Sequence, residues 1–127
     1  MNVKTLKKML KAICDDGYAE WIPRFCPPDG GNYSINHIYV DDDGDICLQS
    51  SDCEDDPHSF TAWQIYKRLN NHYPKSYVYF EEEYYDDYDD ECYDCYDIEY
   101  NWYIDTWYDD DENEDVEELY IDCCEMD

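Results

Sequence analysis

The chain has 127 residues, and its 35 Asp and Glu against 8 Lys and Arg give a formal net charge of −27 at pH 7. This charge excludes nucleic acid and anionic membranes as direct partners, because both are negatively charged, and it favours basic protein surfaces or cations. The length suits a single domain with a buried core, so we predict one domain over residues 1–127.

The negative charge is concentrated in the second half of the chain. Residues 76–127 contain 23 Asp and Glu, no Lys, Arg or His, and 11 of the 16 tyrosines. Residues 1–75 are close to neutral, with 12 acidic and 8 basic residues. Acidic tails without aromatic residues normally stay disordered. Because this half interleaves carboxylates with large rings, which can supply a core, we predict a folded, Tyr-rich acidic surface.

The N-terminal residues predict a cytoplasmic protein. Residues 1–13 lack the continuous apolar run of a signal peptide, and no segment approaches the length of a membrane span. In a reducing compartment the eight cysteines are expected to be thiols rather than disulfides.

Residues 3–13 predict an N-terminal helix, because their apolar residues recur at helical spacing and lysines occupy the other faces. Asn2 is a candidate N-cap, and Asp16-Gly17 a candidate end. Residues 21–34 contain three prolines and two glycines, so they predict a loop or an irregular edge.

Residues 33–40 and 45–49 predict two short strands joined by a turn that ends in Asp43-Gly44. The same aspartates also resemble a calcium-binding loop. That alternative fails at its sixth position, where Ile46 replaces the glycine that the sharp turn needs. A hairpin is therefore the favoured interpretation.

A second helix is predicted after Asp56, which can cap it, with Pro57 in its first turn. Pro74 prevents its continuation. Its apolar stripe is expected to face the core and comprises Phe60, Trp63, Tyr66 and Leu69.

After Pro74 the apolar period becomes two, which predicts strands at 77–80 and 98–105. One face of the second strand should carry Ile98, Tyr100, Trp102 and Ile104, and the other Glu99, Asn101, Tyr103 and Asp105. Residues 81–91 either extend the two strands into a long hairpin or form a loop. Residues 109–115 predict a solvated loop. Residues 116–124 fit either a strand or a helix capped by Asp115 and Glu118.

Together these elements predict an α+β fold. We expect a mostly antiparallel sheet, an N-terminal helix and a central helix packed on it, and a strongly acidic C-terminal half.

The cysteines do not predict a metal or redox site. Cys92-x-x-Cys95 has zinc-ligand spacing, but the candidate second pair, Cys123-Cys124, is adjacent and poorly suited to binding one ion. Surrounding carboxylates should raise the pKa of the thiols and suppress the reactive thiolate. The sequence also lacks a nucleophile elbow, a phosphate-binding loop and a paired-His motif. We therefore predict neither an enzyme nor a resident cofactor.

The acidic half fits the imitation of a phosphate backbone. Neighbouring phosphates of one DNA strand are about 7 Å apart, and residues i and i+2 of a β-strand are separated by about 6.8 Å. Two rows of carboxylates are expected, one through Asp97, Glu99 and Asp105, and the other through Glu81, Glu83, Asp87 and Asp89. Interleaved Tyr and Trp are the residue types that dominate interface energetics. The predicted partner-binding residues are Glu81, Glu83, Asp86, Asp87, Asp89, Asp90, Asp97, Glu99, Tyr103, Asp105, Trp107, Asp109, Asp110 and Asp111.

In these features, residues 76–127 resemble the DNA-mimic inhibitors of phages and mobile elements, namely anti-restriction proteins and acidic anti-CRISPR proteins. The resemblance is one of composition and transfers no residue role. It implies a small inhibitor that acts in the cytoplasm of the host cell by occupying the nucleic-acid cleft of a defence nuclease.

The predicted function is therefore inhibition of a basic DNA-binding protein, a CRISPR or restriction nuclease. A CRISPR effector such as Cas9 or Cas12 reads DNA within a positively charged channel. Two alternatives remain open: an acidic chaperone or antitoxin that shields another basic protein, and a protein that binds divalent cations. The sequence does not determine the oligomeric state.

Overall fold

The computed structural model describes residues 1–51, 58–85, 87–88 and 90–126. Within them the chain forms two α-helices, a short π-helical turn and a six-stranded sheet with the order β1-β6-β5-β4-β3-β2. The α+β class is therefore confirmed. Three of the five strand pairings are antiparallel, whereas β1 pairs with β6 and β3 with β4 in parallel, so the sheet is mixed.

The N-terminal helix, α1 (Val3–Ile13), forms as predicted. The Asn2 side chain caps it by accepting a hydrogen bond from the backbone N–H of Thr5, at 2.9 Å. Its apolar face is fully buried. The chain leaves the helix through the π-helical turn Cys14–Tyr18, where Gly17 has φ 99°, a left-handed conformation that favours glycine.

Residues 21–34, expected to form a loop or an irregular edge, contain the edge strand β1 (Pro23–Cys26), whose bounds the sequence did not predict. It pairs with the middle of β6, aligning Phe25 with Ile121. Because β1 is an edge strand and Pro23 is its first residue, the missing N–H of proline is tolerated. The prolines and glycines predict a loop, so this strand could be recognised only from its pairing with β6, which is distant in sequence.

The predicted hairpin at 33–49 is confirmed as β2 (His37–Val40) and β3 (Ile46–Ser51), which are antiparallel neighbours. Asp41 closes the turn, because its Oδ1 accepts the backbone N–H groups of Asp43 at 3.0 Å and Asp45 at 2.9 Å. The first strand is shorter than predicted, since Tyr33 instead forms a bridge with Phe25.

The second helix, α2 (Ala62–Leu69), begins later than predicted. Its N-cap is Thr61, which forms a capping box with Gln64. The predicted cap at Asp56 and Pro57 lies outside the described residues. The predicted stripe is confirmed in part: Leu69 is buried, and Phe60 and Tyr66 pack partly buried against the core. Trp63 is instead 43% exposed, and Ala62 and Ile65 complete the buried face.

The acidic half forms three long strands, β4 (Val78–Tyr85), β5 (Glu91–Asp109) and β6 (Glu114–Glu125). The open alternatives are thus resolved, because residues 79–85 and 91–97 pair as a long hairpin and residues 116–124 form a strand. The loop predicted at 109–115 is shorter in the structure, where only residues 110–113 form a turn between β5 and β6. The register of β5 on β6 shifts between Ile98 and Trp102. Tyr100 falls in this irregularity and is exposed instead of facing the core.

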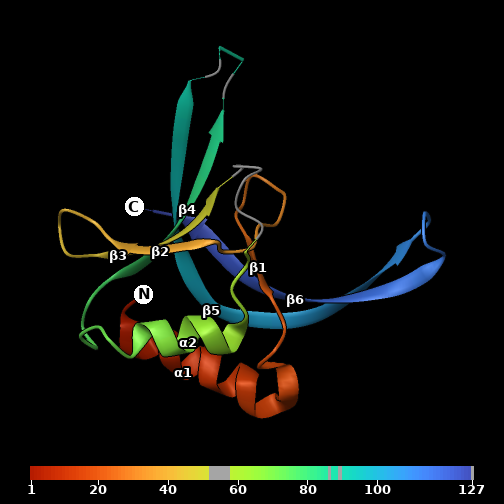
Figure 1. Ribbon diagram of the computed structural model, residues 1–127, viewed down its shortest axis with the longest axis horizontal. Helices are drawn as coiled ribbons and strands as arrows, with labels where there is room; N and C mark the ends of the chain where they lie inside the picture. Colours follow the sequence, from red (N-terminus) through yellow and green to blue (C-terminus); the bar gives the residue numbers. More distant parts are fainter. Residues whose placement is uncertain (52–57, 86, 89, 127) are drawn as a thin grey trace.

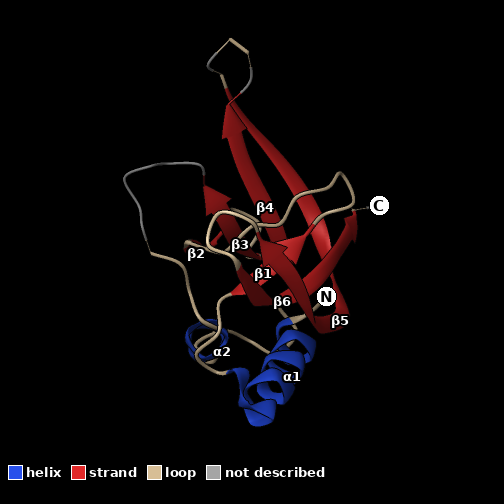
Figure 2. Ribbon diagram, turned by 90° about the vertical axis from the view of Figure 1, so that its right-hand side faces the viewer, coloured by secondary structure: helices blue, strands red, loops and turns tan. Residues whose placement is uncertain are grey.

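Both helices cover the same side of the sheet (Figure 2). The core between the helices and the sheet is mainly aliphatic, and within it the rings of Phe25 and Phe80 are stacked with their centroids 5.6 Å apart. Among the described tyrosines of the acidic half, only Tyr79 and Tyr96 are buried. The number of tyrosines suggested that they would supply much of the core, but most of the described ones lie outside it. Neither helix of the described chain has the length and apolar character needed to cross a membrane.

Candidate interaction surface

Two hairpin arms project from the body of the protein in different directions (Figure 1). The first arm comprises the paired residues 82–85 of β4 and 91–94 of β5. The second arm comprises the paired residues 103–109 of β5 and 114–120 of β6. Because β5 belongs to both arms, the irregularity at 98–102 is the corner between them. No Lys, Arg or His occurs in either arm.

One face of the second arm alternates rings with carboxylates. The successive cross-strand pairs on this face are Tyr103–Tyr120, Asp105–Glu118, Trp107–Val116 and Asp109–Glu114. Successive pairs on one face are separated by about 6.8 Å, so the two acidic pairs are about 14 Å apart. Like charges placed directly opposite each other destabilise a sheet. The arm therefore keeps these carboxylates at a cost in stability.

The first arm brings three carboxylates together near its base. Glu82 and Asp94 are cross-strand partners, and Asp29 approaches them from the loop after β1. One carboxylate oxygen from each lies within 4.8 Å of the other two. The hydroxyl of Tyr96 donates to Asp29 Oδ2 at 3.2 Å. This cluster is a concentration of charge that the sequence spacing did not reveal.

The predicted partner-binding residues differ in their position and in their exposure. Asp87 and Asp90 are exposed near the end of the first arm, and Glu99 is exposed at the corner. On the second arm and its turn, the exposed residues are Tyr103, Asp105, Trp107, Asp110 and Asp111. Glu83, Asp97 and Asp109 are half-buried, and Glu81 is buried. Asp86 and Asp89 lie outside the described residues.

The expected row through Asp97, Glu99 and Asp105 is not continuous. Asp97 pairs with Tyr79 in the body, whereas Asp105 lies beyond the corner on the second arm. Asp97 also approaches the N-terminal amine of Met1, with 3.9 Å between the nitrogen and Oδ1. The bend of β5 therefore separates carboxylates that an ideal straight strand would align.

Glu81 is the centre of a hydrogen-bond network on the sheet face opposite the helices. Its Oε1 accepts the hydroxyl of Tyr39 at 2.9 Å and the amide of Gln49 at 2.6 Å. Its Oε2 accepts the thiol of Cys95 at 3.5 Å. With three donors and 8% exposure, this side chain is engaged inside the protein more than it is presented to a partner.

The same network holds its thiols and phenols in their neutral forms. Burial, followed by the charge of Glu81, raises the pKa of Cys95 to about 11. Burial is also the main cause that raises the pKa of Cys47 to about 12. Burial, followed by the charge of the neighbouring Cys47, raises the pKa of Tyr79 above its ordinary value. Neutral thiols are poor nucleophiles, so this network has a structural character.

None of the seven cysteines in the described part of the chain forms a disulfide. Cys92 and Cys95 are three residues apart on β5, and successive side chains of a strand alternate between its faces. The two sulfurs therefore project from opposite faces of the sheet. Although Cys92-x-x-Cys95 has zinc-ligand spacing, this arrangement does not suit a metal ion shared by the two sulfurs.

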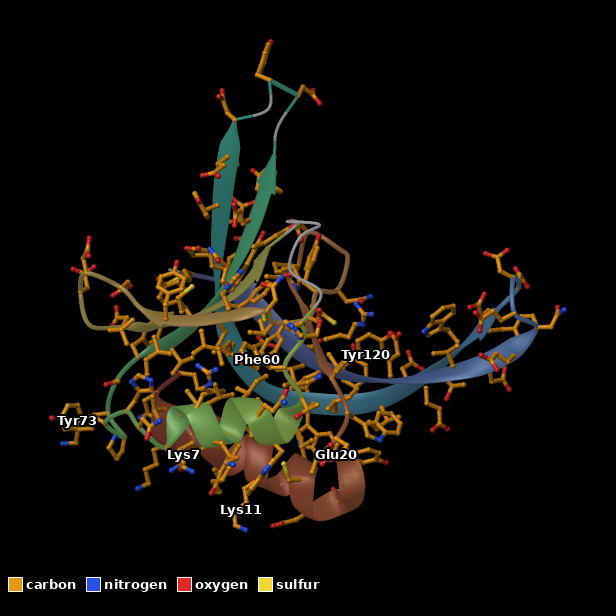
Figure 3. The ribbon with its side chains drawn as sticks, viewed as in Figure 1. Lys7, Lys11, Glu20, Phe60, Tyr73 and Tyr120 are labelled. Carbon is orange, nitrogen blue, oxygen red and sulfur yellow. The ribbon has the colours of Figure 1, made fainter. Side chains whose placement is uncertain are left out.

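The basic residues are gathered on the other side of the molecule. Seven of the eight Lys and Arg belong to α1, α2 or the loop after α2: Lys4, Lys7, Lys8, Lys11, Lys67, Arg68 and Lys75. Lys11 points away from the sheet (Figure 3). The eighth, Arg24, lies on β1 with its Nε 3.7 Å from Glu118 Oε2. The arms are thus separated from most of the chain's positive charge.

Comparison with known proteins gave no matching family model, no matching curated protein and no matching solved structure.

Proposed function

We propose that this protein is a DNA-mimicking inhibitor that occupies the basic DNA-binding cleft of a defence nuclease, most specifically a CRISPR effector. The observation that carries the proposal is the pair of projecting arms, which contain no basic residue and display carboxylates beside exposed rings. A cleft that binds DNA presents Arg and Lys to phosphates. Carboxylates held on a folded scaffold can occupy the same cleft without any chemical step.

The geometry of the second arm supports a surface that replaces phosphates in part. Its acidic pairs recur at about 14 Å, close to twice the distance of about 7 Å between neighbouring phosphates. The rings of Tyr103 and Trp107 lie on the same face as these pairs and are 40% and 44% exposed. Charged residues on this surface would accelerate encounter with a basic cleft, and the rings would supply contact area.

A competition experiment tests this function. A panel of purified CRISPR effectors and restriction nucleases is mixed with labelled DNA and increasing amounts of the protein. Bound protein and bound DNA should exclude each other on the susceptible nuclease, and the inhibition should weaken steeply as salt is added. Equal binding to the free and the DNA-loaded nuclease would show that the protein is not a DNA mimic.

Two triple variants separate a defined surface from net charge. Replacement of Asp105, Asp109 and Asp110 by Lys changes the second arm, and replacement of Asp15, Asp16 and Glu20 by Lys makes the same change of charge beside α1. Only the first variant should lose most of the inhibition. Matching losses would indicate general attraction to basic proteins, as expected of an acidic chaperone.

The second candidate function, binding of a divalent cation, is favoured by the convergence of Asp29, Glu82 and Asp94. Carboxylate oxygens are preferred ligands of calcium. If this cluster is the functional site, millimolar calcium should raise the melting temperature of the protein, and Asp94→Asn should abolish the increase. A melting temperature that calcium does not change would remove this candidate.

A further inference from the structure

A small hollow lies where the second arm joins the body. Tyr120, labelled in Figure 3, is one of its lining residues. The volume of the hollow is about 370 Å³, near the lower end for ligand pockets and suited to one side chain. The hollow is lined by Arg24, Asn32, Asp105, Trp107, Glu118 and Tyr120. Its walls therefore come from β1, the loop that follows β1, and both strands of the second arm.

Aromatic rings flank the hollow along the arm. The ring of Tyr120 packs against that of Tyr103, with centroids 5.4 Å apart, and its hydroxyl donates to Glu118 Oε2 at 2.8 Å. Trp107 follows Asp105 by two residues on the same strand face and remains 44% exposed. Ring faces attract cations through their quadrupole, and tryptophan does so most strongly.

The carboxylates between these rings are not neutralised within the protein. Asp105 and Glu118 are direct cross-strand partners. Arg24 lies 3.7 Å from Glu118, whereas Asp105 forms no ion pair within the described residues. Asp105 Oδ1 accepts the backbone N–H of Thr106 at 2.9 Å, and its Oδ2 has no hydrogen bond there. The hollow thus contains two carboxylates, Asp105 and Glu118, and one guanidinium, Arg24, so one negative charge remains for a second cation.

We propose that this hollow binds the guanidinium group of an arginine side chain from the partner. Arginine fits better than lysine, because its planar group can stack on a ring while donating hydrogen bonds to a carboxylate. The identification of that arginine with one in a DNA-binding cleft rests on the proposed function. The binding of a guanidinium group itself does not.

The test uses the full-length protein and two short peptides, acetyl-Gly-Arg-Gly-amide and its citrulline counterpart, which is neutral and nearly the same shape. Binding is followed by NMR through the indole N–H signal of Trp107. The arginine peptide should shift this signal in a saturable way, and the citrulline peptide should not. The absence of a shift, or equal shifts with both peptides, would overturn the proposal.

A matched pair of double variants locates the site. Asp105→Asn with Glu118→Gln removes both carboxylates of the hollow. Asp109→Asn with Glu114→Gln makes the same change of charge four residues further along the same face. The first variant should weaken binding of the arginine peptide at least about tenfold, as expected for lost charge-assisted hydrogen bonds, and the second less than about threefold. Equal losses would mean that the arm attracts cations without a defined site.

A second pair of variants tests the ring. Trp107→Ala should weaken peptide binding several-fold, whereas Tyr108→Ala, on the opposite face of the same strand, should leave it unchanged. For the Trp107 variant, binding is followed through the backbone N–H signals of residues 105–107. Failure of peptide binding together with intact DNA competition would reject the hollow and keep the proposed function. Peptide binding without DNA competition would keep the hollow as a guanidinium site and reject the proposed function.

Discussion

The body and the arms of this protein follow opposite physical rules. In the body, two helices and the base of the sheet enclose an aliphatic core in which side chains such as Leu6, Leu48 and Phe80 are fully buried. In the second arm, by contrast, the only buried side chain is Leu119, where the arm meets β1. Acidic residues stand opposite each other along it. The body therefore accounts for the stability of the fold, and the arms are maintained against their own repulsion.

This contrast explains how a chain with a net charge of −27 can fold. Repulsion is weakest when charges are far apart and surrounded by water. The two arms diverge from the corner of β5 and so place their carboxylates in different regions of solvent (Figure 1). A compact arrangement of the same residues would bring these charges closer together.

The largest expected effect is alkaline unfolding of the body. Burial, followed by the charge of Asp29, raises the pKa of Tyr96, and burial likewise raises that of Tyr39. An unfolded tyrosine ionises near pH 10. Since these folded pKa values are higher, the native state retains protons that the unfolded chain loses, and stability is lost as pH rises above about 10. Circular dichroism should show cooperative unfolding that coincides with the appearance of tyrosinate absorbance.

Tyr96→Phe sharpens this expectation, because it keeps the ring and removes the hydroxyl that titrates. The loss of stability with rising pH should then be less steep. A smooth titration of tyrosinate absorbance near pH 10, with the fold intact, would contradict the expected protection.

A second large effect is expected in the centre of the core. Phe80→Ala removes a ring that stacks with Phe25 and contacts Tyr33 and Tyr96, and it should lower the free energy of unfolding by about 3–5 kcal/mol. Urea denaturation measures this change, and Phe80→Leu serves where the alanine variant does not fold. Tyr108→Ala, on an exposed part of the second arm, should change stability by less than about 0.5 kcal/mol. Comparable losses would show that the arm contributes to the core after all.

A smaller effect is expected where the first arm meets the body. Glu81→Ala leaves Tyr39, Gln49 and Cys95 without their common acceptor and should lower the free energy of unfolding by about 1–3 kcal/mol. Glu83→Ala, two residues further along the same face, is the matched control and should have a weaker effect. If both variants behave alike, Glu81 is a surface acid and the network contributes little.

The smallest effect has the opposite sign. Asp109→Asn with Glu114→Gln removes two like charges that face each other on the second arm, so stability should rise by about 0.2–1 kcal/mol. The asparagine can keep the hydrogen bond from the backbone N–H of Asp111. Denaturation at low and high salt checks this prediction, since screening should reduce the gain. A decrease in stability would indicate that these carboxylates have favourable interactions.

The sequence by itself determined the elements whose signals are local. The helix α1 was predictable because apolar spacing, the Asn2 cap and Gly17 all act within a few residues. The β2–β3 hairpin was predictable for the same reason, since Asp41 and Gly44 shape the turn without distant contacts. The concentration of acids and rings in residues 76–127 also needs no structure to be recognised.

The tertiary structure alone decided how these pieces meet. The strand β1 exists because β6 supplies its hydrogen-bond partners from almost 100 residues away, as the pairing of Pro23 with Leu119 shows. The buried face of α2 depends on which residues α1 and the sheet contact, so Ala62 is buried and Trp63 is not. The bend in β5 and the burial of Glu81 likewise arise from pairing between strands. Contacts of this kind join residues distant in sequence, and local periodicity carries no record of them.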